Sequence, residues 1–423
     1  MKDAEGLSRV AAFVVPQIGC LEETGEADEP YQLLDPDGQL VVPAAVFFAD
    51  LQAASKSAAT IRSYGMDLLR WYRFLWAVDV QWDQVTRAEA RDFCRWLQLA
   101  DKPVRVHWRH QRRGITAPML PAPRVEPGTP NPVTGRSAPG RKYAPSTRAH
   151  CETVLRTFYD FHLDEGTGPI LNPFPLDRSR RNARAHAHHN PLELFHPERQ
   201  GRYRPKVPKR IPRRIPDELF NALFAALKYN RDRALLAFWV STGARAEELL
   251  TSRVKDASPG QQLVGVVRKG TRAYQQIPAS TDAFVWLRLA QEEAWRKGAP
   301  RGRNHSLWWT LRRPWRPLNY HAARAMLNRA NDLLGSNWTL HDLRHTAAYR
   351  MARDPQMSLT DVQWVLGHAH LSTTEIYLAA SQEEVIEQVL AHHARRAQQP
   401  AKPLAPAPGY NPASLNTLFG GLP

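Results

Sequence analysis

The strongest constraint on how this chain folds is a stretch near its middle that cannot belong to a compact core. Residues 176–214 hold twelve lysines and arginines against three acids, with five prolines among them. So much charge and proline leaves too little apolar surface for the stretch to fold alone. Because a chain of 423 residues is long enough for two domains, we predict that this stretch is an interdomain linker.

Helical patterns come before the linker. Apolar residues at helical spacing predict one helix from about Ser57, and Thr86 with Glu89 forms the capping-box pattern that opens a second. A third helix is expected after Ser146, with Gly166 as its stop signal. We therefore expect the first domain to be helical.

Residues 104–142 interrupt these helices. They are rich in proline and hold eight lysines and arginines against one acid, which is typical of a loop or an insertion. We predict a small helical domain over 44–175 that carries this basic insertion. Residues 1–43 precede it as an N-terminal segment, in which only a turn at Asp35-Pro36-Asp37-Gly38 can be assigned.

The pattern beyond the linker is again helical, with one exception. Two short β-like runs, Leu263–Arg268 and Arg272–Pro278, are joined by Lys269-Gly270-Thr271, which predicts a hairpin. We therefore predict a fold that is mainly α with a small β-hairpin or sheet (α+β) in a second domain over 215–398. Residues 399–423, rich in proline, alanine and glycine, are expected to form a flexible tail.

Charge gives the first indication of function. The chain carries 57 lysines and arginines against 41 acids, a net charge of +16 and a pI near 10.0. This excess favours a polyanionic partner, most often nucleic acid; an ordinary soluble surface and a weak membrane-surface binder are the alternatives. The linker alone supplies +9 of that charge. It could lie along a phosphate backbone or serve as a solvated hinge. The candidate contacts to DNA phosphates are Arg178, Arg180, Arg181 and Arg184.

Several classes of protein are not expected. No apolar run approaches the roughly 18 residues of a membrane helix, and the first residues lack the order of a signal peptide. Cys20, Cys94 and Cys151 lie too far apart for a zinc site or disulfide framework, and we interpret them as buried thiols in a reducing compartment. We expect a cytoplasmic, nucleoid-associated protein that contacts no membrane.

Arginine, lysine and histidine lie at informative positions in the second domain. Arg245 follows a break at Gly243, and Glu248, three residues on, can orient its guanidinium if the run is helical. Lys269 lies at the tip of the predicted hairpin. Thr339 with Asp342 resembles a capping box, which predicts that a helix starts there. His341 and Arg344 then share one face near its N-terminus, where the helix dipole favours anions.

The segment that ends at Tyr377 adds two more groups. Gly367 is expected to end one helix, and Ser372 with Glu375 is expected to cap the next. His368 would then lie in the joining loop, and Tyr377 just inside the new helix. A single tyrosine on such a helix is ordinarily a core or surface residue.

Metal binding is a competing interpretation of the histidines. His341 and His345 stand four residues apart, as in zinc proteases, but Asp342 replaces the expected glutamate and Arg344 would place a cation beside the metal. A second candidate cluster lies in the linker and comprises His186, His188, His189 and His196. It lacks cysteine partners and regular spacing.

The order and spacing of these motifs resemble the tyrosine recombinase family, which includes phage integrases and Xer-type resolvases. The resemblance covers about 216–395, and the helices of Ser57–Gly166 resemble the family's core-binding domain less specifically. It implies a helical core-binding domain followed by a tyrosine-recombinase catalytic domain. It also implies a catalytic set of Arg245, Lys269, His341, Arg344, His368 and Tyr377, with Glu248 in support.

The resemblance further implies a mechanism. Tyr377 would attack the scissile phosphate, form a 3′-phosphotyrosine link and free a 5′-hydroxyl, with Lys269 as the general acid. No metal, ATP or other cofactor is expected. The expected partner is double-stranded DNA, bound as a tetramer on paired sites, with a monomer or weak oligomer when free. A type IB topoisomerase and a non-catalytic DNA-binding protein of the same fold are the alternatives.

Overall fold

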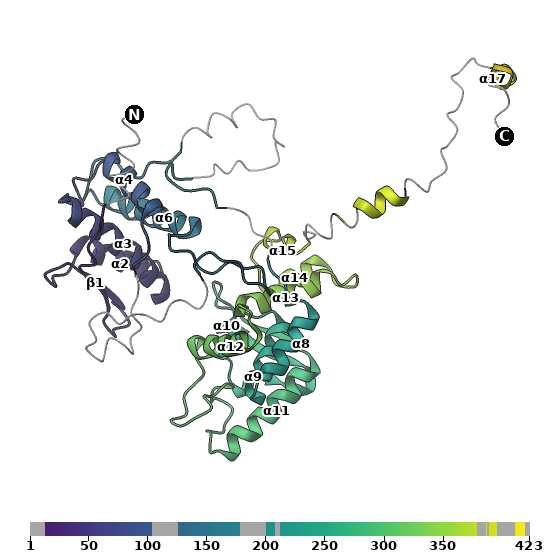
Figure 1. Ribbon diagram of the computed structural model, residues 1–423. Coiled ribbons are helices and arrows are strands. Elements are labelled where there is room, and N and C mark those ends of the chain that lie inside the picture. The colour runs from purple at the N-terminus through teal and green to yellow at the C-terminus, as the bar shows by residue number, and fades with distance from the viewer. Residues whose placement is uncertain are drawn as a thin grey trace. The chain divides into compact units, whose positions relative to one another are not determined.

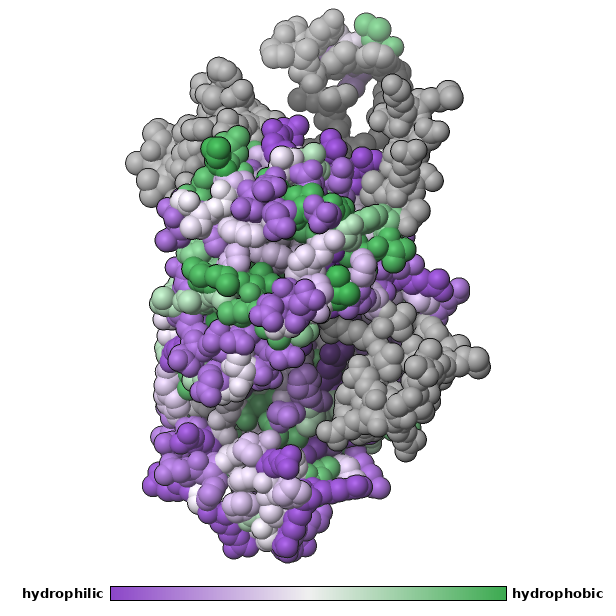
Figure 2. Space-filling view, turned by 90° about the vertical axis from the view of Figure 1, so that its left-hand side faces the viewer, coloured by the Kyte–Doolittle hydropathy of each residue, from purple (hydrophilic) through white to green (hydrophobic). Residues whose placement is uncertain are grey.

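The structure is a computed structural model, and it describes residues 13–103, 126–177, 200–207, 212–378, 386, 389–395 and 411–418. The chain divides into two compact units, Met1–Lys209 and Arg210–Pro423. Figure 1 shows the elements of each. On the face in Figure 2, hydrophilic residues separate apolar ones into patches. None of the described helices is long and apolar enough to cross a membrane.

The described residues of the first unit form a hairpin and four helices. Strands β1 (Cys20–Glu23) and β2 (Tyr31–Leu34) pair antiparallel. The helices are α2 (Val42–Ala53), α3 (Ala58–Val78), α4 (Arg87–Leu99) and α6 (Pro145–Asp164). Their shared core is aromatic: Trp71 meets Phe93 and Phe174 edge to face, and its Nε1 donates to Tyr159 Oη at 2.9 Å.

The N-terminal segment, which the sequence left unassigned, belongs to this core. Val15, Leu33 and Val41 are buried in the same cluster as the helices. The predicted turn is present, because Asp35 Oδ1 accepts from the amides of Asp37 and Gln39. Of the cysteines, only Cys151 is buried; Cys20 and Cys94 are partly exposed, so the expectation of three buried thiols was wrong for two of them.

The described parts of the insertion and the linker make hydrogen bonds within the unit to which each belongs. Residues 126–142 of the insertion fold back through a bridge between Pro130 and Ser137. In the linker, Arg204 Nη1 donates to Thr153 Oγ1 at 2.7 Å within the first unit. Arg213 Nη2 donates to Asp342 Oδ2 at 2.5 Å within the second. Outside the described residues lie Arg178, Arg180, Arg181, Arg184, His186, His188, His189 and His196.

The second unit is mainly helical, as predicted. Its longer helices are α8 (Asp217–Ala226), α9 (Asn230–Thr242), α11 (Thr281–Arg296), α12 (Tyr320–Leu334), α13 (Leu340–Ala352) and α14 (Leu359–Leu366). Among the residues that the structure describes, the shorter ones are α10 (Ala246–Leu250), α15 (Ser372–Glu375) and α17 (Pro412–Leu418), with two 3₁₀ turns, Val254–Asp256 and Pro259–Gln261. Helix α17 lies in the tail that was expected to be flexible.

The sheet of the second unit is small and antiparallel. Its order is β3 (Ala257–Ser258), β4 (Leu263–Val267) and β5 (Tyr274–Pro278), with Val267 opposite Tyr274 next to the hairpin tip. The predicted hairpin is therefore confirmed. Helix α9 is the centre of the domain core: Phe238 meets Phe284 of α11 and Trp308 edge to face, and α13 packs on α9 as well.

Capping residues fix where several helices start. Thr86 and Glu89 form the predicted capping box at α4, and the Thr86 amide donates to Glu89 Oε2 at 2.8 Å. Thr339 and Asp342 form the predicted box at α13, with the Thr339 amide 2.8 Å from Asp342 Oδ2. Each box satisfies backbone amides that a helix N-terminus otherwise leaves without partners.

Candidate active site

A glycine turn places Arg245. Helix α9 ends at Gly243, whose φ is 62°, and a Cβ there would lie 2.7 Å from Leu366 Cδ2, so glycine is required twice over. Arg245 follows as the N-cap of α10. Its Nη1 donates to Glu248 Oε1 at 2.8 Å, and its backbone amide donates to Glu248 Oε2 at 3.0 Å. The arginine–glutamate pair expected from helical spacing is therefore present.

Glu248 is the buried anion around which this region is built. Its side chain is 2% exposed. Besides Arg245, its donors are Arg268 Nη1 at 3.1 Å and the backbone amide of Lys269 at 3.1 Å. Burial raises the pKa of Glu248, but the backbone amides of Arg245 and Lys269 and the Arg245 guanidinium together lower it below its ordinary value. A charged carboxylate thus joins α10 to the hairpin.

The hairpin contributes one exposed cation and one buried cation. Lys269 lies exposed at the tip. Arg268, the residue after β4, is 4% exposed. Its Nε donates to Gln275 Oε1 at 2.7 Å, and its Nη2 donates to the carbonyl oxygen of Val365 at the end of α14. Sequence reasoning did not single out Arg268.

Arg344 of α13 is held rigidly in the interior. It is 3% exposed, and it donates to the carbonyl oxygens of Gly243 at 2.7 Å and Leu366 at 2.8 Å. Its Nη2 also lies 2.9 Å from His368 Nε2. Burial, and then the charge of Arg245, lower the pKa of Arg344 to about 10, which leaves it protonated at neutral pH.

His368 connects Arg344 to Tyr377. Because an arginine can only donate, His368 Nε2 accepts and the ring proton lies on Nδ1, 2.9 Å from Thr374 Oγ1. Burial, and then the charge of Arg344, lower the pKa of His368 to about 4, so the ring is neutral at pH 7. The ring stacks on Tyr377 with centroids 6.3 Å apart and planes 10° apart.

Tyr377 is buried rather than displayed on a surface. It is 5% exposed, and its hydroxyl lies 2.8 Å from His345 Nδ1. The His345 ring in turn meets His341 edge to face, with centroids 4.2 Å apart. Burial raises the pKa of Tyr377, although the charges of Arg344 and Arg245 oppose that rise. His341 remains exposed at the start of α13.

The local structure at Tyr377 differs from the prediction. Ser372 and Glu375 do not form a capping box: α15 covers only Ser372–Glu375, with Leu371 as N-cap and no side-chain cap. Leu371 has helical angles (φ −60°, ψ −37°), whereas a capping residue needs an extended backbone to aim its side chain at the first amides. Tyr377 therefore lies in a turn just after the helix, not inside it.

The described site has three connected parts. Glu248 joins Arg245 to the backbone of Lys269, Arg344 contacts His368, and His345 joins Tyr377 to His341. The charge of Arg245 contributes to the lowered pKa of each of His341, Arg344 and His368. Cations that repel one another in this way are relieved when an anion binds among them. The site is therefore suited to a phosphate or another small anion.

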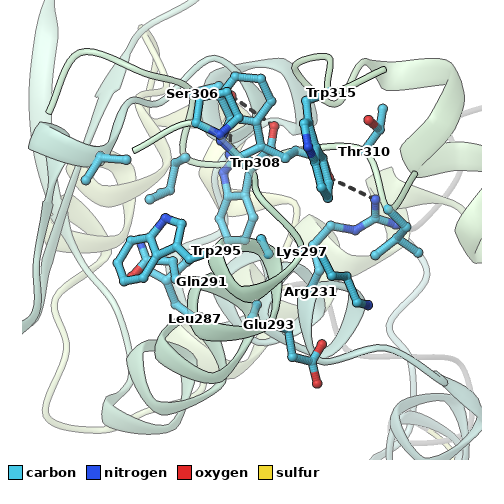
Figure 3. A pocket seen from close by; sticks show the side chains of 17 residues that line it. Arg231, Leu287, Gln291, Glu293, Trp295, Lys297, Ser306, Trp308, Thr310 and Trp315 are labelled. Carbon is cyan, nitrogen blue, oxygen red and sulfur yellow. Dashed lines mark hydrogen bonds between the residues drawn. The ribbon is translucent and has the colours of Figure 1, made fainter. Parts of the chain in front are cut away.

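Two other features bear on the chemistry. Among the described residues, no three histidine, cysteine, aspartate or glutamate side chains converge as a metal site. Figure 3 shows a separate pocket where Trp295 of α11 faces Trp308 and Trp315 of the following loop. Trp308 Nε1 donates to the carbonyl oxygen of Leu249 at 2.8 Å, so this loop supports α10. None of the six predicted catalytic residues lines the pocket.

The fold and site together define a known class. Residues 213–384 match the phage integrase family, and residues 45–105 match the N-terminal SAM-like domain of phage integrases. The chain belongs to this family of tyrosine recombinases, as the resemblance of its motifs indicated.

Individual relatives agree with this assignment. The chain is 30% identical to "Tyrosine recombinase XerC" of Corynebacterium efficiens, over 40% of this chain and 52% of the relative. It is 29% identical to "Tyrosine recombinase XerD" of Yersinia pestis, over 39% of this chain and 55% of the relative. The match thus spans about half the length of these relatives. The Tn1549 transposon integrase, solved with transposon right end DNA, shares the fold at 13% identity and a TM-score of 0.51, covering 84% of this chain and 99% of that one.

Proposed function

We propose that the chain is a site-specific DNA recombinase or integrase that cleaves and rejoins strands through a 3′-phosphotyrosine link at Tyr377. The observation that carries this proposal is the run of contacts from Arg344 through His368 to Tyr377. Arg344 lies 2.9 Å from His368, which stacks on the Tyr377 ring. A phenol hydroxyl beside fixed cations is suited to attack a phosphate diester, since the cations stabilise the charge that develops on the phosphate oxygens.

The proposed first step is a transesterification. Tyr377 Oη bonds to phosphorus and gives up its proton to solvent water, while the bond from phosphorus to O5′ breaks and Lys269 supplies a proton to that oxygen. Arg245 and Arg344 hold the non-bridging oxygens through forked donors. The 5′-hydroxyl of a partner strand then reverses the step. Because the phosphotyrosine conserves the bond energy, the step consumes no ATP and requires no metal.

The histidines are proposed to act through hydrogen bonds rather than charge. His368 is neutral at pH 7, and its two ring nitrogens face Arg344 and Thr374. In this arrangement it holds the Arg344 guanidinium in place. His341 is exposed and free to face a phosphate directly. Since Tyr377 is 5% exposed, its hydroxyl must turn out of its contact with His345 before it attacks.

The proposed partner is double-stranded DNA. The Tn1549 integrase was solved with transposon right end DNA, and the XerH recombinase, with a TM-score of 0.51, with its difH substrate. Both share only the fold with this chain, so the net charge of +16 is the independent support. We extend the proposal to a tetramer on paired sites, a monomer or weak oligomer when free, and a place at the nucleoid in the cytoplasm.

A covalent-trapping experiment tests the proposed nucleophile. A nicked suicide substrate carrying the protein's own recombination site loses the short strand after cleavage, so the covalent adduct accumulates. Tyr377→Phe should bind this DNA and form no adduct. Tyr320→Phe, at a 40% exposed tyrosine at the start of α12, is the matched control and should form adduct at the normal rate. Adduct formed by Tyr377→Phe would place the nucleophile elsewhere.

The same protein can be tested for topoisomerase activity. A type IB topoisomerase relaxes a supercoiled plasmid that carries no special site, whereas a site-specific recombinase cleaves mainly at its own sequence. We expect little relaxation of such a plasmid under conditions that give full adduct on the suicide substrate. Efficient relaxation would favour the topoisomerase.

A further inference from the structure

Arg268 is a buried cation that neither the sequence motifs nor the proposed chemistry uses. We propose that Arg268 is a positioning residue that fixes the hairpin tip, and with it the leaving-group acid Lys269, by anchoring Glu248. This inference rests on the proposed function, because it assigns a part in that reaction to a residue that does not touch DNA.

The guanidinium of Arg268 joins three elements. Its Nε donates to Gln275 Oε1 at 2.7 Å across the hairpin, and its Nη1 donates to Glu248 Oε2 at 3.1 Å in α10. Its Nη2 donates to the carbonyl oxygen of Val365 in α14. Only the flat, five-donor fork of arginine can reach three acceptors in these directions. The hairpin is thereby tied to both helices.

Glu248 passes this constraint to Lys269. Its Oε1 accepts from the Lys269 backbone amide at 3.1 Å, while its Oε2 accepts from Arg268. Lys269 itself is exposed at a glycine-containing turn, and Gly270 has a φ of 104°. Such a tip has few contacts of its own. The hydrogen bond from the Lys269 backbone amide to Glu248 therefore fixes the position from which the Lys269 side chain extends. Arg268 holds the other oxygen of that carboxylate.

The guanidinium of Arg268 packs closely against Gly367. A Cβ on Gly367 would lie 2.9 Å from Arg268 Nε, and Gly367 has a φ of 63°. The guanidinium thus lies against the loop that begins at Gly367 and leads to His368. Burying a cation beside Glu248 is an expensive way to gain stability, because apolar residues of similar volume usually serve as well or better. That expense is explained if the arginine serves the geometry of the site.

A substrate with sulfur in place of the bridging O5′ separates this role from a general structural one. A thiolate leaves without needing a proton, because thiols are far stronger acids than alcohols. Loss of the general acid is therefore relieved on that substrate, whereas loss of a phosphate clamp is not. On the normal oxygen substrate we expect Arg268→Met to slow adduct formation by roughly 10–100-fold. On the sulfur substrate we expect its rate within about threefold of the unaltered protein.

Reference variants calibrate the result. Lys269→Met should show the same relief, and Arg245→Lys should not. Arg288→Met, at an arginine of α11 whose side chain is 64% exposed, is the matched surface control and should cleave both substrates normally. Gln275→Ala removes one partner of Arg268 without disturbing its burial beside Glu248. It should show a smaller defect that the sulfur substrate also relieves, which keeps the test decisive if Arg268→Met folds poorly.

The outcomes separate this inference from the proposed function. If the unaltered protein forms no adduct on either substrate, the proposed function fails. If it forms adduct and Arg268→Met matches it on the oxygen substrate, the positioning role is wrong. The positioning role is also wrong if Arg268→Met and Gln275→Ala are each slowed as much on the sulfur substrate as on the oxygen substrate. Arg268 would then support the fold or the clamp rather than Lys269.

Discussion

The hydroxyl of Tyr377 lies 2.8 Å from Nδ1 of His345, in a part of the interior where both side chains are neutral at pH 7. Burial, and then the neighbouring His341, lower the pKa of His345 to about 4, while burial raises that of Tyr377. The bond therefore joins a phenol to an uncharged imidazole. It holds the proposed nucleophile in place without ionising it.

A double-mutant cycle should detect this bond in the stability of the folded protein. His345→Ala leaves the Tyr377 hydroxyl buried without its partner, which should lower the free energy of unfolding by about 1–3 kcal/mol. The same change made in a Tyr377→Phe background should cost less, giving a coupling of about 1 kcal/mol in urea unfolding. His321→Ala, on the exposed start of α12, is the control. Additive effects of the two changes would show that the contact contributes nothing.

Acid should destabilise the protein through the same histidines. His345 and His368 both have a pKa of about 4, below the ordinary 6.5. As the pH falls below 6.5, the unfolded chain binds protons first. The contribution of these two histidines to stability is thus complete above pH 6.5 and is lost as the pH falls towards 4. Urea unfolding between about pH 7 and about pH 5 should show a falling midpoint. Replacing both residues by asparagine should flatten the fall, and an unchanged slope would refute the assignment.

The two proposed clamp arginines should both resist replacement by lysine, but for partly different reasons. Either change keeps the charge and loses the fork, so we expect cleavage to drop roughly a hundredfold or more with DNA affinity little changed. Arg344→Lys should also lower the melting temperature, because the carbonyl oxygens of Gly243 and Leu366 lose their donors. Arg245, whose side chain is 31% exposed, should affect the melting temperature less. Normal cleavage by either lysine variant would contradict the clamp.

Chelation should leave cleavage intact. Adduct formation in excess EDTA should match that in magnesium to within a few-fold, because the proposed step uses arginines and a lysine where many nucleases use metal ions. The measurement is the initial rate on the suicide substrate after dialysis against the chelator. Loss of activity that zinc or magnesium restores would revive the metal interpretation of His341 and His345.

Local rules explain which features could be predicted from the sequence. The capping box of Thr339 with Asp342 and the turn at Gly243 depend on residues within a few positions, and both were found. Ser372 matched the capping pattern equally well, yet Leu371 adopts helical angles and the cap does not form. The pattern records which side chains could cap, whereas the backbone at the junction decides whether they do.

Contacts between distant residues explain most of what was missed. His345 and Tyr377 are 32 positions apart, and no spacing rule joins them. Arg268 is different, because its burial was readable. Val264 and Val266 of β4 are buried, and Arg268, just beyond the strand, continues their alternation and is buried as well. The family motif includes the neighbouring Lys269 but not Arg268, so the motif predicted only the lysine.

The linker offers the most direct test of how the protein holds DNA. Two described arginines of the linker already have hydrogen-bond partners: Arg204 donates to Thr153, and Arg213 donates to Asp342. Neither guanidinium is therefore fully available to phosphates. The predicted phosphate contacts, Arg178, Arg180, Arg181 and Arg184, lie between residue 177 and residue 200, outside the described residues. Replacing all four by glutamine should flatten the slope of log affinity against log salt by up to about 0.9 for each phosphate that the segment no longer neutralises. The ranking of target sequences should not change.

A control variant separates position from net charge. It removes the same number of positive charges from α11 and the loop after it, at Arg288, Arg296, Lys297 and Arg301. If the linker tracks the DNA backbone, the linker variant should flatten the salt slope clearly more than this control, because only charges that displace counterions from phosphates contribute to the slope. Equal slopes in the two variants would mean that the linker is a solvated hinge. A changed ranking of targets in the linker variant alone would mean that the segment reads bases or groove shape, since backbone contacts carry no sequence information.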